Sequence, residues 1–233
     1  MGEMVKKSFF EQVEGKLIVS CQALPPEPLH SSFIMGRMAL AASWGGAAAI
    51  RANTVEDILE IRKNVDLPII GIIKKVYDDH PDLYITPTAA EVDALARCGV
   101  EVIALDATDR VRPGERHISE LFPEIRKKYP KQLFMADCSN AAEGIAAAEL
   151  GFDLIGTTLA GYTAYTAGRS LPPYDMIKTL VRECGKPVVA EGNISTPEQL
   201  RHAMDMGVLT VVVGSAITRP MEITKRFVAA LSL

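Results

Sequence analysis

Eight short apolar runs, rich in β-branched residues, alternate with helix-like segments along this chain. The runs are Lys16–Cys21, Ala47–Arg51, Leu67–Lys75, Glu101–Asp106, Leu133–Asp137, Asp153–Thr158, Pro187–Glu191 and Leu209–Gly214. Strands that alternate with amphipathic helices form right-handed βαβ units and a parallel sheet. Eight such units in 233 residues predict an α/β fold, a closed (β/α)8 TIM barrel that occupies residues 1–233 as a single domain. A doubly wound open sheet is the alternative.

Helix start and stop signals fall between the runs. Helix N-caps are predicted at Thr54, Thr88, Asn140 and Thr196, and helix ends at Gly99, Gly151 and Gly207. Residues 3–14 predict an extra N-terminal helix that closes the bottom of the barrel, with Phe9, Phe10 and Val13 sealing the core.

Composition excludes several classes of function. The net charge is −4, so no broad basic face for nucleic acid is expected. No stretch is long and apolar enough to cross a membrane, and the charged N-terminus does not resemble a signal peptide. The four cysteines and four histidines are scattered without metal-ligand spacing. We therefore expect a cytoplasmic protein with reduced thiols and no metal site.

Polar residues end six of the apolar runs. They are Gln22, Arg51, Lys74, Asp106, Asp137 and Glu191. The C-terminal ends of barrel strands carry the active site, whereas the opposite ends serve stability. These residues therefore predict a catalytic rim, and the alternative is an ion network that only satisfies itself.

Strand parity sharpens this expectation, because barrel interiors stack in layers drawn from alternate strands. Runs one, three, five and seven end in Gln22, Lys74, Asp137 and Glu191, which predicts one polar layer. Alternation then places Ile72, Met135 and Val189 inside, and Ile73, Ala136 and Ala190 against the helices. Lys75 should face away from the barrel interior.

Two glycine turns follow the last two runs. Gly192 and Asn193 form the first, and Gly214 and Ser215 form the second. Loops at these positions commonly bind phosphate through backbone N–H groups at the start of a short extra helix, which Ser215–Ile217 would begin here. Arg219 adds a charged donor. The turns therefore predict binding of a phosphorylated molecule.

The chain resembles the bacterial N-acetylmannosamine-6-phosphate 2-epimerase family over nearly its whole length. The stretches that carry the resemblance are 18–24, 28–30, 50–53, 70–74, 102–108, 136–137, 156–158, 161–163, 189–193 and 216–220. The resemblance implies a TIM barrel, a catalytic pair formed by Lys74 and Glu191, and no metal or organic cofactor. It also implies that Gln22, Arg51, Asp137 and Arg219 contact a sugar phosphate in sialic acid catabolism.

Epimerisation at C2 of an N-acetylhexosamine needs a base poised near neutral pH. Lys74 can be that base only if its pKa falls well below about 10.4. Burial and Arg51 lower this pKa, whereas Glu191 and Asp137 raise it, and the sequence leaves the balance open. A Schiff-base lysine, as in class I aldolases, and a non-catalytic sugar-phosphate sensor are the rival interpretations.

The C-terminal segment, residues 221–233, predicts a helix with apolar positions at Phe227, Val228 and Leu231. These side chains indicate a homodimer, and the alternative is that they pack on their own barrel.

Overall fold

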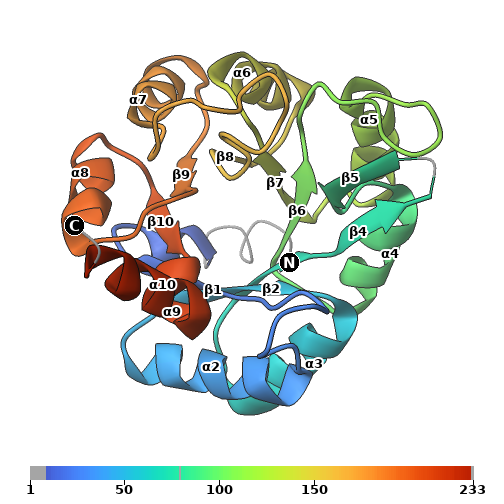
Figure 1. Ribbon diagram of the computed structural model, residues 1–233. Helices are drawn as coiled ribbons and strands as arrows, with labels where there is room; N and C mark the ends of the chain where they lie inside the picture. Colours follow the sequence, from blue (N-terminus) through green and yellow to red (C-terminus); the bar gives the residue numbers. More distant parts are fainter. Residues whose placement is uncertain (1–8, 79, 232–233) are drawn as a thin grey trace.

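The computed structural model describes residues 9–78 and 80–231, within which eight parallel strands close into a barrel ringed by helices (Figure 1). The barrel strands are β1 (Leu17–Cys21), β2 (Ala49–Asn53), β3 (Ile69–Ile72), β6 (Val102–Asp106), β7 (Leu133–Asp137), β8 (Leu154–Gly156), β9 (Val188–Glu191) and β10 (Thr210–Val213). Each barrel strand pairs with the next one along the chain, and β10 closes on β1. The predicted (β/α)8 TIM barrel is confirmed, and the open-sheet alternative is excluded.

The helices after residue 14 are α2 (Ser32–Trp44), α3 (Val55–Asn64), α4 (Ala89–Arg97), α5 (Ile118–Lys128), α6 (Ala141–Leu150), α7 (Tyr174–Glu183), α8 (Pro197–Asp205), α9 (Ser215–Thr218) and α10 (Pro220–Ala230). Four of them begin at the predicted N-caps. Thr54, Thr88, Asn140 and Thr196 each accept a backbone N–H at the start of α3, α4, α6 and α8. These caps fix where the helices start, and hence the lengths of the loops at the rim.

The barrel wall separates two apolar clusters. Ile72, Met135 and Val189 belong to the cluster inside the barrel. Ala136 and Ala190 belong to the cluster between the barrel and its helices, and Ile73 packs against that outer cluster. The predicted inside and outside positions are therefore confirmed.

Residues 9–13 of the predicted N-terminal helix are helical, Glu14 lies in the turn that follows, and positions 3–8 of the prediction lie outside the described residues. Phe9 and Val13 are buried and belong to the cluster inside the barrel. The N–H of Gly15 donates to the carbonyl of Leu209 at 2.9 Å, next to the start of β10. The described part of this helix therefore closes the bottom of the barrel, as predicted.

The third run departs from the prediction of one continuous strand. β3 ends at Ile72, and a separate antiparallel hairpin follows, made of β4 (Lys74–Tyr77) and β5 (His80–Ile85). Thr86 closes the root of the hairpin, because its N–H donates to the carbonyl of Ile73 at 2.7 Å and its hydroxyl accepts the N–H of Ile73 at 3.1 Å. Lys74 is therefore the first residue of the hairpin rather than the end of a barrel strand. Lys75 faces outward as expected and forms a 3.3 Å ion pair with Glu91.

Candidate active site

Arg51 joins two carboxylates at the centre of the barrel mouth. It projects from β2 and is fully buried. Its Nη1 and Nη2 donate to Oδ1 and Oδ2 of Asp137 at 3.1 and 2.6 Å, a bidentate pair. Nη1 also lies 3.2 Å from Oε2 of Glu191. Strand parity predicted that Asp137 and Glu191 lie in one layer, but it did not place Arg51 with them. The long side chain of Arg51 reaches them from the second strand of the barrel.

Lys74 lies within electrostatic range of this group, at the root of the hairpin. Its backbone N–H donates to Oδ1 of Asn53, the last residue of β2, at 2.8 Å. Burial lowers the pKa of Lys74 to about 8, helped by the positive charges of Arg51 and Arg219 and opposed by Glu191 and Asp137. The sequence left open whether these opposing effects raise or lower the pKa of Lys74. The structure shows a net lowering, so Lys74 can lose its proton near neutral pH.

Glu191 has the complementary shift. Its side chain is 12% exposed at the end of β9. Burial raises the pKa of Glu191 to about 7, and the negative charge of Asp137 adds to the rise, whereas Arg51 and Lys74 oppose it. A single guanidinium faces two carboxylates here, so it cannot neutralise both. The site thus holds a lysine and a glutamate whose pKa values both approach neutrality, a common property of acid–base sites.

Two threonines hold Glu191, and sequence reasoning did not single them out as site residues. The hydroxyl of Thr157 donates to the carbonyl of Glu191 at 2.7 Å and accepts its N–H at 3.1 Å. The hydroxyl of Thr158 lies 2.6 Å from Oδ1 of Asp137 and 3.3 Å from Oε2 of Glu191. Their position directly after β8 could have identified them, because the polar residues after other barrel strands had already indicated that the site lies at this rim.

Among the polar strand ends, two buried atoms have no hydrogen-bond partner in the described part of the chain, namely Oε1 of Gln22 and Nε of Arg51. Gln22 is 8% exposed, and its amide nitrogen donates to the hydroxyl of Ser20 at 2.5 Å. Buried polar groups are normally paired, so unpaired ones at the end of a barrel strand suit a polar ligand.

The two glycine turns lie at the ends of β9 and β10. Gly192 has φ +108° and its Cβ position would lie 3.3 Å from the carbonyl oxygen of Thr157, so the turn requires glycine. Asn193 also adopts a left-handed conformation, with φ 57°. Gly214 precedes the predicted short helix, which is α9 and starts at Ser215. The start of this helix is therefore confirmed.

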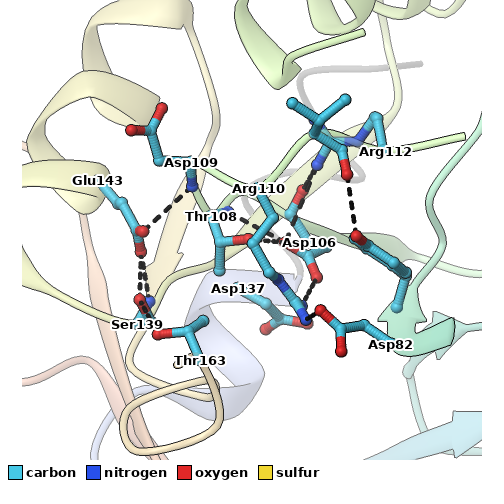
Figure 2. Close-up of polar contacts among 12 residues, drawn as sticks. Asp82, Asp106, Thr108, Asp109, Arg110, Arg112, Asp137, Ser139, Glu143 and Thr163 are labelled. Atoms are coloured by element: carbon cyan, nitrogen blue, oxygen red, sulfur yellow. Dashed lines mark hydrogen bonds and ion pairs between the residues drawn. The ribbon is translucent and has the colours of Figure 1, made fainter. Parts of the chain in front are cut away.

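Arg219 follows α9 and pairs with Glu27 of the loop after β1, with Nη2 2.8 Å from Oε1. Asp106, the remaining strand-end residue, is buried at the end of β6 and bonded to residues of the loop that follows (Figure 2). The structure thus gathers Arg51, Asp137 and Glu191 in direct contact and Lys74 within electrostatic range, while Asp106 has other partners.

Within the part of the chain that the structure describes, no three His, Cys, Asp or Glu side chains are arranged to hold a metal ion. All four cysteines are free thiols. None of the described helices combines the length and apolarity needed to span a bilayer.

Comparison with known proteins gives one consistent result. Residues 35–232 match a family described as "Putative N-acetylmannosamine-6-phosphate epimerase". A relative from Clostridium perfringens strain SM101 is 55% identical over 215 residues, covering 92% of this chain and 96% of its own. One from Caldanaerobacter subterraneus is 51% identical over 224 residues, covering 96% and 94%. Both are named "Putative N-acetylmannosamine-6-phosphate 2-epimerase".

A solved structure of the N-acetylmannosamine-6-phosphate 2-epimerase from Clostridium perfringens is similar over 95% of both chains. Its TM-score is 0.89 and its sequence identity is 52%. A family match over most of the chain, relatives above 50% identity and a closely similar barrel agree. The chain belongs to the N-acetylmannosamine-6-phosphate epimerase family.

Proposed function

We propose that this protein is an isomerase that interconverts N-acetylmannosamine 6-phosphate and N-acetylglucosamine 6-phosphate, in sialic acid and amino-sugar catabolism. The observation that carries the proposal is the pair of opposite pKa shifts at one barrel mouth. The pKa of Lys74 falls to about 8, and the pKa of Glu191 rises to about 7. General acid–base catalysis is most effective when the pKa values of its groups lie near the working pH.

The chemistry needs removal of a proton from C2, which lies α to the carbonyl of the open-chain sugar. Neutral Lys74 or ionised Glu191 takes this proton, and the other group moves protons to and from the sugar oxygens. Reprotonation on the opposite face inverts C2. The enolate formed on the way carries negative charge on oxygen, and preorganised donors stabilise such charge.

Arg51 and Gln22 are proposed to hold the oxygen at C1 or the acetamido group, Arg51 as a donor through Nε and Gln22 as an acceptor through Oε1. Their unpaired atoms, Nε and Oε1, support this assignment. Asp137 acts through Arg51, because its carboxylate oxygens bond to that guanidinium and to Thr158. The proposed reaction uses these protein groups and needs neither a metal nor an organic cofactor.

The phosphate is proposed to bind at the glycine turns, to the backbone of Gly192, Asn193, Gly214 and Ser215. Arg219 supplies a charged donor beside them. The left-handed turn at Gly192 and the start of α9 at Ser215 support this placement.

The test is exchange of the C2 proton with deuterated solvent, followed by NMR. Wild type is expected to exchange the proton and to form both epimers. Lys74→Ala is expected to lose exchange by roughly a hundred- to ten-thousandfold, which is the contribution of a general acid–base group, while it still binds the sugar phosphate. Exchange in Lys74→Ala at the wild-type rate would exclude the assignment.

Borohydride trapping and the NMR turnover assay together separate the rival functions. A class I aldolase would form a Schiff base at Lys74 that borohydride traps as a stable adduct with substrate. A sugar-phosphate sensor would bind its ligand without turnover. We expect turnover and no trapped adduct, because a sensor has no need of the lysine and glutamate whose pKa values converge here.

We further propose that the chain acts as a single-domain homodimer in the cytoplasm. α10 has no buried residue, and Phe227, Val228 and Leu231 are 74%, 57% and 88% exposed. This argues against packing of the helix on its own barrel, and a second copy is the proposed occupant of its apolar face. Phe227→Glu is expected to yield a monomer in analytical ultracentrifugation. The free thiols suit a reducing compartment.

A further inference from the structure

The β4–β5 hairpin carries Lys74 but takes no part in the hydrogen-bond ladder of the barrel, because β3 pairs directly with β6. Lys74 lies opposite Ile85 at its base, and the next pair is Lys75 with Tyr84. In the described part of the chain, the backbone hydrogen bonds of β4 and β5 pair these strands with each other and do not join them to a barrel strand. The direction in which the hairpin leaves the barrel therefore depends on side-chain contacts further out.

On one side of the hairpin, Lys75 and Tyr77 of β4 donate to Glu91 of α4. On the other side, the contacts come from the end of β6 and the loop after it. The carboxylate of Asp106 is fully buried and accepts the N–H and hydroxyl of Thr108 at 3.0 and 2.6 Å (Figure 2). Its other oxygen forms a 2.5 Å ion pair with Nη2 of Arg110. Nε of Arg110 donates to the hydroxyl of Thr108 at 3.1 Å and closes a ring of three residues. We refer to Asp106, Thr108 and Arg110 as the latch.

Arg110 of the latch holds β5. Its guanidinium carbon lies 4.5 Å from the centre of the Tyr84 ring, and Nη1 lies 3.5 Å from Oδ2 of Asp82. Tyr84 is 4% exposed, and its hydroxyl donates to the carbonyl of Val111 at 2.9 Å. One face of the hairpin is thus fastened to the end of β6.

The loop that bears the latch is itself anchored on its far side, as Figure 2 shows. The N–H of Asp109 donates to Glu143 at 3.1 Å, and Glu143 also accepts the N–H and hydroxyl of Ser139 at 2.6 and 2.8 Å. The buried side chain of Arg112 donates to the carbonyl of Asp106. These contacts make the latch a fixed point against which the hairpin is held.

We propose that Asp106 and Arg110 are positioning residues, which hold the β4–β5 hairpin so that Lys74 meets C2 of the substrate. This inference rests on the proposed epimerase function. It also explains why the polar strand end Asp106 does not join the Arg51 group, since its carboxylate is occupied by the latch. Small displacements of a reacting group reduce rates strongly, so a loose hairpin lowers kcat more than it weakens binding.

A loose hairpin also changes the proton affinity of Lys74. Four charged groups face its ammonium: Arg51 from β2, Asp137 from β7, Glu191 from β9 and Arg219 after α9. All four stay in place when the latch is broken. A displaced Lys74 moves away from two positive and two negative charges, whose effects on its pKa oppose each other. It also loses burial, the largest cause of the shift, so its pKa rises from about 8 towards its ordinary value.

The test compares Arg110→Gln with wild type and with a matched control, Arg116→Gln. Arg116 lies in the same connection and pairs with Glu124 at 2.8 Å, on an exposed surface. Arg110→Gln is expected to lower kcat about ten- to a hundredfold and to leave KM within about twofold. The Lys74 limb of its pH profile moves to higher pH, and hydrogen exchange rises in residues 74–85 but not in the barrel strands. Arg110→Lys, which keeps the charge, recovers part of kcat, and Arg116→Gln behaves as wild type.

A second variant, Asp106→Asn, weakens the same ion pair from the barrel side and is expected to shift the pH profile in the same direction. Wild-type kcat and pH profile in both variants would overturn the proposal. So would a uniform rise of hydrogen exchange through the barrel with an unshifted pH profile, because that shows a purely structural role. Failure of the epimerase function itself is distinct, because wild type would then show no turnover.

Discussion

At the mouth of the barrel, the side around Arg51 differs from the side around the glycine turns in what it offers a substrate. The first side presents charged side chains that contact one another, and Asp137 and Arg51 are fully buried. The second side presents backbone at Gly192 and at the start of α9, and its one arginine, Arg219, is 28% exposed. Buried charges tune each other's pKa values, whereas backbone N–H groups bind an anion without titrating.

This difference predicts which properties a substitution on each side changes. Changes on the Arg51 side should alter kcat, its pH dependence and stability. Changes on the glycine-turn side should alter mainly KM, and loss of the positive charge of Arg219 should also move the Lys74 limb of the pH profile slightly to higher pH.

Arg51→Met should have the largest effect. It leaves Asp137 and Glu191 as two buried carboxylates without the guanidinium that pairs them, which costs roughly 3–5 kcal/mol of unfolding free energy. kcat should fall at least about a thousandfold, as for loss of a preorganised donor to an oxyanion. Urea unfolding and NMR turnover measure the two losses. The double variant Arg51→Met, Asp137→Leu should regain much of the stability but none of the activity, and recovery of activity would contradict this difference between the two sides.

Arg219→Met should have a smaller effect and a different signature. Loss of a charged donor to a phosphate weakens binding by roughly 1.5–3 kcal/mol, so KM should rise about ten- to a hundredfold. kcat should change less than about threefold, because the acid–base pair stays in place. Steady-state kinetics gives both constants, and added inorganic phosphate should inhibit wild type more than the variant. An equal loss of kcat would place Arg219 with the Arg51 side.

Thr158→Val should have the smallest effect and the most specific one. The valine removes the hydroxyl 3.3 Å from Glu191, a contact that lowers the pKa of that carboxyl. The limb of the kcat/KM profile that Glu191 sets, expected near pH 7 in wild type, should move up by roughly half a unit. Thr158→Ser should restore the wild-type limb. A shift to lower pH would contradict the assignment of this limb to Glu191.

The sign of the accompanying stability effect follows from the same shift. The folded-state pKa of Glu191 is raised from 4.5 to about 7. Its contribution to stability is therefore fully present below about pH 4.5 and is lost as the pH rises through about 7. In Thr158→Val that loss should extend to slightly higher pH, which urea unfolding between pH 5 and 8 measures.

Much of the barrel was predictable because its signals are local. Period-two alternation in the apolar runs placed Met135 inside and Ala136 outside, and the structure agrees. Helix caps such as Thr88 are decided within four residues of sequence. The start of α9 at Ser215 was predictable for the same reason.

The site was predictable only in part. The polar strand ends and strand parity brought together Asp137 and Glu191, because residues that end neighbouring odd-numbered strands meet at one edge. Parity could not place Arg51, since a long side chain crosses from one layer to the next. The β4–β5 hairpin was also missed, because Lys74 continues an apolar run whose strand actually ends two residues earlier.

By itself, the sequence determined that eight strands alternate with helices and that polar residues stand at their C-terminal ends, because hydrophobic periodicity and capping act over a few residues. Only the tertiary structure decided that Lys74 leaves the barrel on a hairpin, that Arg51 is shared by two carboxylates, and that Lys74 and Glu191 shift towards neutral pKa values. Burial and charge–charge distances are set by residues far apart in the chain, which meet only when the barrel closes.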